Sequence, residues 1–372
     1  MSVSVRKIAS VQKISMIIKT KTSEQAQVNG WTCFVVPNTF KIYQHVAYLE
    51  IDTFIFKESE YFEKIKSFIP DDASMIETTD NGFFLKTMQS KSSGLVSQGL
   101  ILPLDIFNLP QDIEIGTDIS KQIGVVKYDD ETSMPMPTQV ITNDFPIWIP
   151  KSDQMRIQNF TMLPEYQAIE FEVSQKLDGT SMTVYHKDGF VGICSRNKIV
   201  AVYNGSMFIR ISDPGFPMER IVTESGLGNT LLSMKKNIAI QAELTGPTIQ
   251  QGATSVFLMN IYDIYDISMH RYMTPDERLS FIDQIKNSKI VSVPIVKRRF
   301  RVFELLQSSE DIYANILKFA DDVFRQEKCE GLVFKSETDV RLSFKAVSNE
   351  YLLETDRLIQ ERKAKKKNNN KK

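Results

Sequence analysis

The sequence is poor in the residues from which many common sites are built. It has three cysteines, Cys33, Cys194 and Cys329, whose wide spacing excludes a paired zinc motif and a disulfide framework. We expect them to be small buried side chains in a reducing compartment. Three histidines leave little material for a histidine-based triad or metal centre. The chemistry of this chain therefore has to come from lysine, arginine and carboxylates.

Long apolar runs and a strong net charge are also missing. No apolar run reaches the roughly 20 residues that a membrane-spanning helix needs, and the start of the chain lacks the pattern of a signal peptide. The net charge is −1, so any binding to phosphates must come from local patches. We therefore expect a protein of the cytoplasm or nucleus without a membrane partner.

What is present is a chain of 372 residues with 42% apolar and 24% charged residues, enough for two domains. Short β-branched and aromatic segments such as Val11–Lys21, Gly30–Phe40 and Ala47–Phe56 predict a small antiparallel barrel in the first part. The stretch 127–150 is rich in Pro, Asp and Thr and marks a boundary, after which strands and helices mix. We predict an α+β fold with a barrel domain at 1–145, a second domain at 146–360, and a disordered basic tail at 361–372.

One strand of the second domain ends in a chemically unusual turn. The segment "AIEFEVSQ" alternates apolar and polar residues, as a half-buried strand does, and runs into "KLDG" at Lys176–Gly179. A lysine amine can serve as a nucleophile, Asp178 could orient it or hold a hydrated metal ion, and Gly179 permits close backbone approach or a positive φ. Alone, this motif is a weak signal that an ordinary turn also explains. A hairpin with the turn Asp188-Gly189 follows.

Six segments in order between residues 176 and 353 resemble the motifs of the covalent nucleotidyltransferases, which are the ATP-dependent ligases and mRNA capping enzymes. They are "KLDG", "SRN" (Ser195–Asn197), "QAELTG" (Gln241–Gly246), "FLMNIYDI" (Phe257–Ile264), "EGLVFK" (Glu330–Lys335) and "LSFKAVSNEYLL" (Leu342–Leu353). Strand periodicity gives an independent reason for a site. In "IAIQAELTG" the apolar residues share one face, so Gln241 and Glu243 project from the other, and in "LSFKA" Lys345 lies opposite Phe344.

The resemblance implies a role for each motif residue. Lys176 would be the nucleophile, and Asp178, Glu243 and Glu330 would hold hydrated Mg²⁺ or Mn²⁺. The other residues implied to bind the nucleotide or its phosphates are Gly179, Arg196, Lys335, Lys345 and Arg156. Phe257 and Met259 are rivals for the adenine face, and core packing explains either equally well. Where the family often has a first motif lysine this chain has Ser343, which leaves Arg341 or Lys335 as the substitute.

Within this superfamily the chain is most similar to the ATP-dependent RNA ligases of the Deinococcus/Naegleria type, which carry an OB domain before the catalytic domain. The segments "GWTCFVVP", "IPKSDQMRIQNF" and "SFKAVSNEYLL" are the marks, and too few residues follow Leu353 for a C-terminal barrel. The family implies sealing of 3′-OH/5′-phosphate RNA ends or nicks through lysyl-AMP and RNA-adenylate. The alternatives are a DNA ligase, a capping guanylyltransferase, or a non-catalytic RNA-binding relic. We expect a monomer, although the sequence does not fix the oligomeric state.

Overall fold

The computed structural model describes residues 7–19, 24–69, 75–89, 95–128, 144–160, 163–203, 208–211, 216–249, 255–305, 311–338 and 341–369. The chain divides into two compact units. The N-terminal unit takes in the described residues up to 128, the short segment 156–160 and the last helix. The catalytic unit takes in 144–155 and 163–348. Most of the predicted boundary stretch, 129–143, lies outside the described residues.

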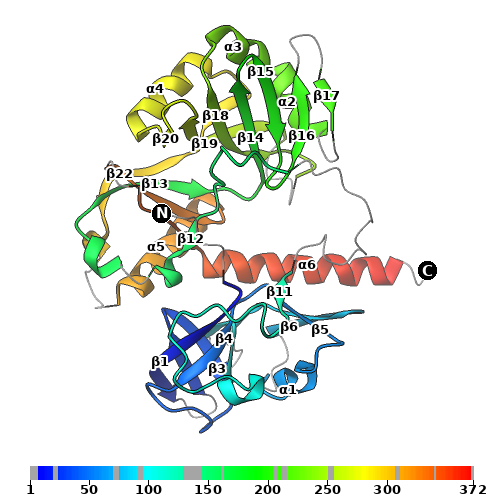
Figure 1. The fold of residues 1–372 in the computed structure, drawn as a ribbon, viewed down its shortest axis with the longest axis vertical. Helices are drawn as coiled ribbons and strands as arrows, with labels where there is room; N and C mark the ends of the chain where they lie inside the picture. The colour runs from blue at the N-terminus through cyan, green and yellow to red at the C-terminus, as the bar shows by residue number, and fades with distance from the viewer. Residues whose placement is uncertain are drawn as a thin grey trace. The chain divides into compact units, whose positions relative to one another are not determined.

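The N-terminal unit is built from antiparallel sheets, as the short apolar segments predict (Figure 1). One sheet has the order β10-β4-β1-β2-β3, another β11-β5-β7-β6, and β8 pairs with β9. The interior consists of aliphatic and aromatic side chains from these strands, with Trp31 and Tyr48 fully buried among them. The strands are β1 (Ala9–Lys19), β2 (Glu24–Val28), β3 (Trp31–Val35), β4 (His45–Leu49), β5 (Thr53–Phe56), β6 (Ile76–Thr79), β7 (Gly82–Leu85), β8 (Thr87–Gln89), β9 (Val96–Gln98), β10 (Leu100–Pro103) and β11 (Val126–Lys127), with helix α1 at Phe62–Lys66.

The last helix, α6 (Asn349–Asn369), belongs to the N-terminal unit rather than to the catalytic one. Its Asp356 forms an ion pair of 3.0 Å with the buried Lys86, which follows β7. The backbone is helical to Asn369, whereas composition predicts disorder from residue 361, and 370–372 lie outside the described residues. The domain limits therefore differ from the predicted ones at this end of the chain, because composition does not report which unit a helix packs against.

The catalytic unit contains a large sheet covered by helices on one face (Figure 1). Its order is β17-β16-β15-β14-β18-β19-β20, with β21 parallel to β19. Asp188 and Gly189, with φ of 50° and 86°, form the predicted hairpin turn between β14 and β15. The elements are β14 (Thr180–Lys187), β15 (Phe190–Cys194), β16 (Ile199–Tyr203), β17 (Phe208–Arg210), β18 (Ile238–Thr245), β19 (Leu258–Asp266), β20 (Arg271–Tyr272) and β21 (Ile290–Ser292), with α2 (Phe216–Glu224), α3 (Leu227–Met234) and α4 (Pro275–Ile285) packed on the core face.

A second, antiparallel sheet of this unit carries both ends of the motif series. Strands β24 (Ser343–Val347), β23 (Gly331–Ser336), β13 (Glu170–Lys176) and β22 (Ile295–Arg301) lie in that order. Phe171, Phe334 and Phe344 are fully buried on one face, and Phe300 brings Phe319 of helix α5 (Ile312–Glu327) to the same side. By strand alternation the other face carries the polar residues Glu172, Lys176, Lys335 and Lys345. Strand β12 (Met155–Arg156) spans the boundary between the units.

The remaining sequence expectations concern the cysteines and the membrane. All three cysteines are buried and free, as predicted. Within the part of the chain that the structure describes, no helix combines the length and the apolar character needed to cross a membrane.

Candidate active site

Lys176 and Glu330 meet at the mouth of the second sheet. Lys176 is the last residue of β13 and pairs in register with Gly331, the first residue of β23, so that Glu330 stands directly beside it. The Glu330 backbone N–H donates to the Lys176 carbonyl at 2.8 Å, and the Lys176 ammonium donates to the Glu330 carboxylate. The lysine side chain is 24% exposed, which means that a substrate can reach the amine although a carboxylate holds it in place.

Glu243 approaches the same point from the large sheet. A Cβ atom on Gly179 would lie 2.6 Å from the Leu244 carbonyl oxygen and 2.8 Å from the Glu243 Cγ atom. Only glycine therefore lets the "KLDG" turn come this close to β18. This is the close backbone approach that the motif predicts, and it brings the nucleophile motif against the third motif.

The charges around Glu243 show that the predicted carboxylates lie near one another. The pKa of Glu243 is raised to about 7, mainly by burial and also by the negative charges of Glu330 and Asp178, while Lys176 and Arg196 act to lower it. These five groups come from four of the six motifs. A half-buried carboxyl beside two further carboxylates is a place where a cation would relieve repulsion.

These residues fit a hydrated divalent metal better than a bare one. Among the described residues, no three His, Cys, Asp or Glu side chains stand close enough to hold a metal ion directly. Mg²⁺ gives up its waters reluctantly and is commonly held through them by one or two carboxylates. The donor set of Asp178, Glu243 and Glu330 has the oxygen chemistry that suits such an ion.

The pKa of Glu243 provides a test of this arrangement. In the folded protein the pKa of Glu243 is about 7, against an ordinary value of 4.5. Between these two pH values the folded protein therefore keeps a proton on Glu243 that the unfolded chain has lost. The stability of the parent should fall as the pH rises through this window, and Glu243→Gln should not share the loss. In metal-free thermal unfolding, we expect the variant to melt several degrees above the parent at pH 8 and close to it at pH 5. If the difference in melting temperature between Glu243→Gln and the parent were the same at pH 8 and at pH 5, a neutral Glu243 in the folded protein would be contradicted.

Lys335 and Arg341 converge on one buried carboxylate. The Lys335 amine donates to the Tyr262 carbonyl at 2.5 Å and lies 3.2 Å from Asp263, which Arg341 also contacts at 2.5 Å. Burial lowers the pKa of Lys335 to about 8. Both cations thus hold β19 against the second sheet. The sequence motif predicts a phosphate clamp for Lys335, whereas the structure gives its amine two protein partners.

Lys345 lies on the same sheet face as Lys335 and Lys176. It pairs in register with Val333 of β23, and its side chain is partly exposed. Because this face also carries Lys176, Lys345 is the motif cation best placed to meet an anion beside the nucleophile.

Neither predicted adenine partner lies on the face that carries Glu243. Met259 is fully buried in the core under the helices, and Phe257 packs against the same core. Core packing is therefore the explanation that the structure favours for each, and contact of either residue with adenine stays a prediction. Tyr262 is an aromatic residue that the sequence motifs did not single out: its hydroxyl contacts Ser152 at 2.8 Å and Ser181 at 3.4 Å.

The position of Tyr262 beside the site follows from its neighbours. Ser181 pairs in register with Glu243, and the Lys335 amine lies 5.2 Å from the centre of the Tyr262 ring. A bulge between Gln241 and Ala242 shifts the register of β18 against β19 by one residue. The signal in the sequence is the Tyr262-Asp263 dipeptide, an aromatic–acidic pair that begins three residues after Met259.

The segment before β13 adds residues that the motifs did not predict. Arg196 of the "SRN" motif forms an ion pair with Asp153, and Lys151 donates to Asn197 at 3.2 Å. The buried Gln241 donates to the Pro150 carbonyl at 2.7 Å. The "PKSD" stretch therefore runs along the polar face of the large sheet, next to the second and third motifs.

Arg156 is placed in the N-terminal unit. Its guanidinium lies 5.6 Å from the centre of the Trp31 ring, and Trp31 donates to Asn159 at 2.6 Å. Asn159 in turn donates to Glu50 at 2.7 Å. The "RIQN" stretch thus contributes to the packing of that unit, and the contact of Arg156 with ATP or RNA stays a prediction.

Comparison with known proteins agrees with this geometry. The profile of the RNA ligase family matches residues 169–347, and that of an OB-fold domain matches residues 2–104. An RNA ligase of Naegleria gruberi, solved as a lysine-to-alanine variant with ATP and Mn, has 29% identity and a TM-score of 0.74, over 95% of this chain and 99% of that one.

The chain carries an RNA ligase domain behind an N-terminal OB-fold domain.

Two further structures of the Naegleria RNA ligase are similar to this chain. The structure with pyrophosphate has 29% identity and a TM-score of 0.74, over 94% of this chain and 99% of that one. The apo form of an aspartate-to-alanine variant has 29% identity and a TM-score of 0.75, over 95% and 99% of the two chains. No curated protein matches the chain at the sequence level.

The two domain matches and the similarity to the Naegleria RNA ligase confirm two predictions from the sequence. These are the α+β fold with an N-terminal OB-like domain and the ligase activity.

Proposed function

We propose that this RNA ligase uses ATP to seal 3′-OH/5′-phosphate nicks or ends in RNA, with Lys176 as the covalent nucleophile. The observation that carries the proposal is the placement of the Lys176 amine against Glu330 and beside Glu243. The similar Naegleria enzyme has been solved with ATP and Mn, with AMP and Mn, and with pyrophosphate. Those ligands are the substrate, adduct fragment and product that a lysyl-AMP pathway requires.

Three exchanges at phosphorus make up the reaction. The Lys176 nitrogen bonds to the α-phosphorus of ATP and loses a proton, while the bond to the bridging oxygen breaks and pyrophosphate leaves. An oxygen of the RNA 5′-phosphate then attacks the same phosphorus and displaces the lysine, giving RNA-adenylate. Finally the 3′-OH attacks the RNA phosphorus and displaces AMP. Each exchange has a good leaving group, which is what a covalent intermediate provides.

The other residues orient and stabilise. Glu330 accepts a hydrogen bond from the amine and so aims it, and Lys345 neutralises charge on the α-phosphate. Asp178, Glu243 and Glu330 would hold a hydrated Mg²⁺ or Mn²⁺, which supplies charge neutralisation to the phosphates when bound. Tyr262, rather than Phe257 or Met259, is the aromatic side chain that we assign to the nucleotide. Arg196, which faces Asp153 across an exposed ion pair, is free to exchange that partner for ribose or phosphate.

Label transfer tests the proposal. The protein is incubated with α-labelled ATP or GTP and Mg²⁺, and then chased with nicked duplexes that differ only in the sugar of the 3′-OH strand. We expect label from ATP on the protein, and sealing of the duplex with a ribose 3′-OH strand. Label from GTP alone would indicate a capping guanylyltransferase, and equal sealing of an all-DNA nick would indicate a DNA ligase. Absence of any adduct would favour the non-catalytic relic, against which the retained Lys176, Glu243, Glu330 and Lys345 argue.

A further inference from the structure

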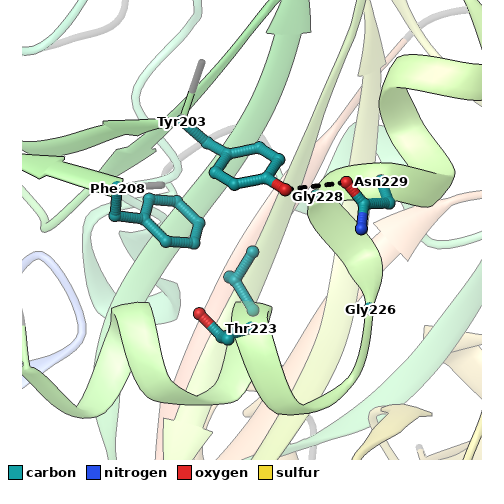
Figure 2. A pocket seen from close by; sticks show the side chains of 7 residues that line it. Tyr203, Phe208, Thr223, Gly226, Gly228 and Asn229 are labelled. Atoms are coloured by element: carbon teal, nitrogen blue, oxygen red, sulfur yellow. Dashed lines mark hydrogen bonds between the residues drawn. The ribbon is translucent and has the colours of Figure 1, made fainter. Parts of the chain in front are cut away.

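The catalytic unit contains a pocket that the reaction described above does not use. It has a volume of about 180 Å³ and lies between β16, β17, α2 and α3. Tyr203 pairs in register with Val191 of the core, so the pocket lies on the helix-covered face of the large sheet, opposite the face with Glu243. Figure 2 shows the residues that shape it, namely Tyr203, Phe208, Thr223, Gly226, Gly228 and Asn229.

Two aromatic rings form one wall of this pocket. The ring centres of Tyr203 and Phe208 are 4.8 Å apart, with an interplanar angle of 35°. A Cβ atom on Gly228 would lie 3.2 Å from Cδ1 of Tyr203, so the absent side chain at this position leaves room for the ring. Both rings are only partly buried, and flat apolar surface therefore faces the opening.

A polar group stands at the edge of the aromatic wall. The Tyr203 hydroxyl donates to Oδ1 of Asn229 at 2.8 Å (Figure 2). Because Oδ1 accepts this bond, the orientation of the Asn229 amide is fixed and its two N–H groups point the other way. An Asn amide is a group that hydrogen-bonds the edge of a nucleobase. Aromatic surface with an amide at its edge suits a planar heteroaromatic ring better than an aliphatic ligand.

The residues that line the pocket carry no charge, and the cations of the neighbouring elements are paired, which favours a base over a phosphate. Arg210 is paired with Glu219 at 2.8 Å, and Arg220 with Glu224 at 2.7 Å. Lys289 shares Glu224. Because each of these cations already has a carboxylate partner, the rim offers little net positive charge to a nucleic-acid backbone. Binding here would come mainly from stacking, which in single-stranded RNA recognition depends little on sequence.

We propose that this pocket binds one unpaired nucleobase, which stacks on Tyr203 and Phe208 and hydrogen-bonds to Asn229. The base comes either from a single-stranded part of the RNA substrate or from a free nucleotide. The RNA source rests on the proposed function, whereas the free-nucleotide source does not. The site is separate from the proposed ATP site at Lys176, since Glu243 beside Lys176 lies on the opposite face of the large sheet.

The variants are chosen to alter the pocket without disturbing the core. Thr223 is exposed on α2, so Thr223→Tyr should fill the opening, and Thr223→Ala is its matched control. Tyr203→Leu removes the stacking surface, while Tyr203→Phe keeps the ring and loses only the bond to Asn229. Stacking on one aromatic wall predicts a loss of affinity of about 5- to 150-fold for Thr223→Tyr and Tyr203→Leu.

The experiment starts from protein adenylated with ATP, so that the nucleotide site at Lys176 is occupied. One arm measures the anisotropy of a labelled nicked RNA duplex with a single-stranded overhang, against the same duplex fully paired; the nick carries no 5′-phosphate, so the adenylate stays on Lys176. The other arm measures uptake of labelled AMP by equilibrium dialysis. Weaker overhang binding in Thr223→Tyr but not Thr223→Ala identifies RNA as the source, and loss of AMP uptake identifies the free nucleotide.

Unchanged binding in both arms would overturn the proposal. Adenylation of Lys176 is measured first and should be equal in all four variants. A result against the pocket can therefore be told apart from a result against the proposed function. If no protein is adenylated, the proposed function fails, and the AMP arm run on the unmodified protein still decides the pocket.

Discussion

Replacing Lys176 with alanine should abolish transfer of label from ATP to the protein, by at least about 10⁴-fold. The reason is that the amine supplies the atom that bonds to phosphorus, and nothing beside it can take that role. Its neighbours Glu330 and Glu243 are carboxyls, and Lys335 is committed to Tyr262 and Asp263. The measurement is the amount of label that stays on the protein in denaturing gel electrophoresis after incubation with α-labelled ATP and Mg²⁺; as a phosphoramidate, the adduct should be stable to alkali and labile to acid.

Two further variants separate nucleophilicity from charge. Lys176→Arg keeps a cation beside Glu330 and should still bind ATP, yet a guanidinium stays protonated and cannot attack. Lys187→Ala removes an exposed lysine at the far end of β14, where it pairs with Asp188, and should label normally. Both controls test whether the loss is specific to one amine. Label on Lys176→Ala equal to that on the parent would show that another residue carries the adenylate.

Those parts of the site that depend on local sequence could be predicted from it. Alternation along β18 placed Gln241 and Glu243 opposite an apolar face, and Ile238, Ile240, Ala242 and Leu244 do pack in the core. The close approach at Gly179 follows from the turn that ends β13. The Asp188-Gly189 turn joins β14 to β15. Each of these features is decided within a few residues, so that periodicity and turn chemistry suffice.

The parts that the sequence could not predict depend on distant partners. Tyr262 is the extra residue of a bulge in β19, where Gln241 pairs with Asp263 but Ala242 pairs with Ile261, and a bulge has no reliable signature in one sequence. Lys335 contacts Asp263, 72 residues earlier in the chain, and no local pattern reports this partner. Helix α6 joins the N-terminal unit through contacts such as Lys86–Asp356, which no local pattern encodes.

The second large effect is expected at a buried ion pair that supports the strand of the nucleophile. Arg278 of α4 donates two hydrogen bonds to Glu172, at 2.8 and 2.7 Å, and both side chains are almost completely buried. Glu172 lies on β13, four residues before Lys176 and on the same face. Arg278→Met should lower the free energy of unfolding by about 3–5 kcal/mol, because it leaves a buried carboxylate whose next cation, Arg298, is 3.8 Å away.

The same helix region offers a matched control. Arg271 makes a bidentate pair with Glu277, but both side chains are more than 40% exposed, so Arg271→Met should cost less than about 1 kcal/mol. Trp148 lies in the catalytic unit and Trp31 in the other, so Trp148 fluorescence in a Trp31→Phe background follows unfolding of the catalytic unit by urea.

The double variant Glu172→Met/Arg278→Met shows whether the loss comes from the unpaired charge or from the missing contact. It removes both buried charges at once, and Arg298 keeps its bonds to Glu337 and Asp276. If the unpaired carboxylate causes the loss, the double variant should be more stable than Arg278→Met alone. Equal and small losses in Arg278→Met and Arg271→Met would instead show that this pair does not hold α4 to β13. The position of Lys176 would then depend on the phenylalanine face of its sheet alone.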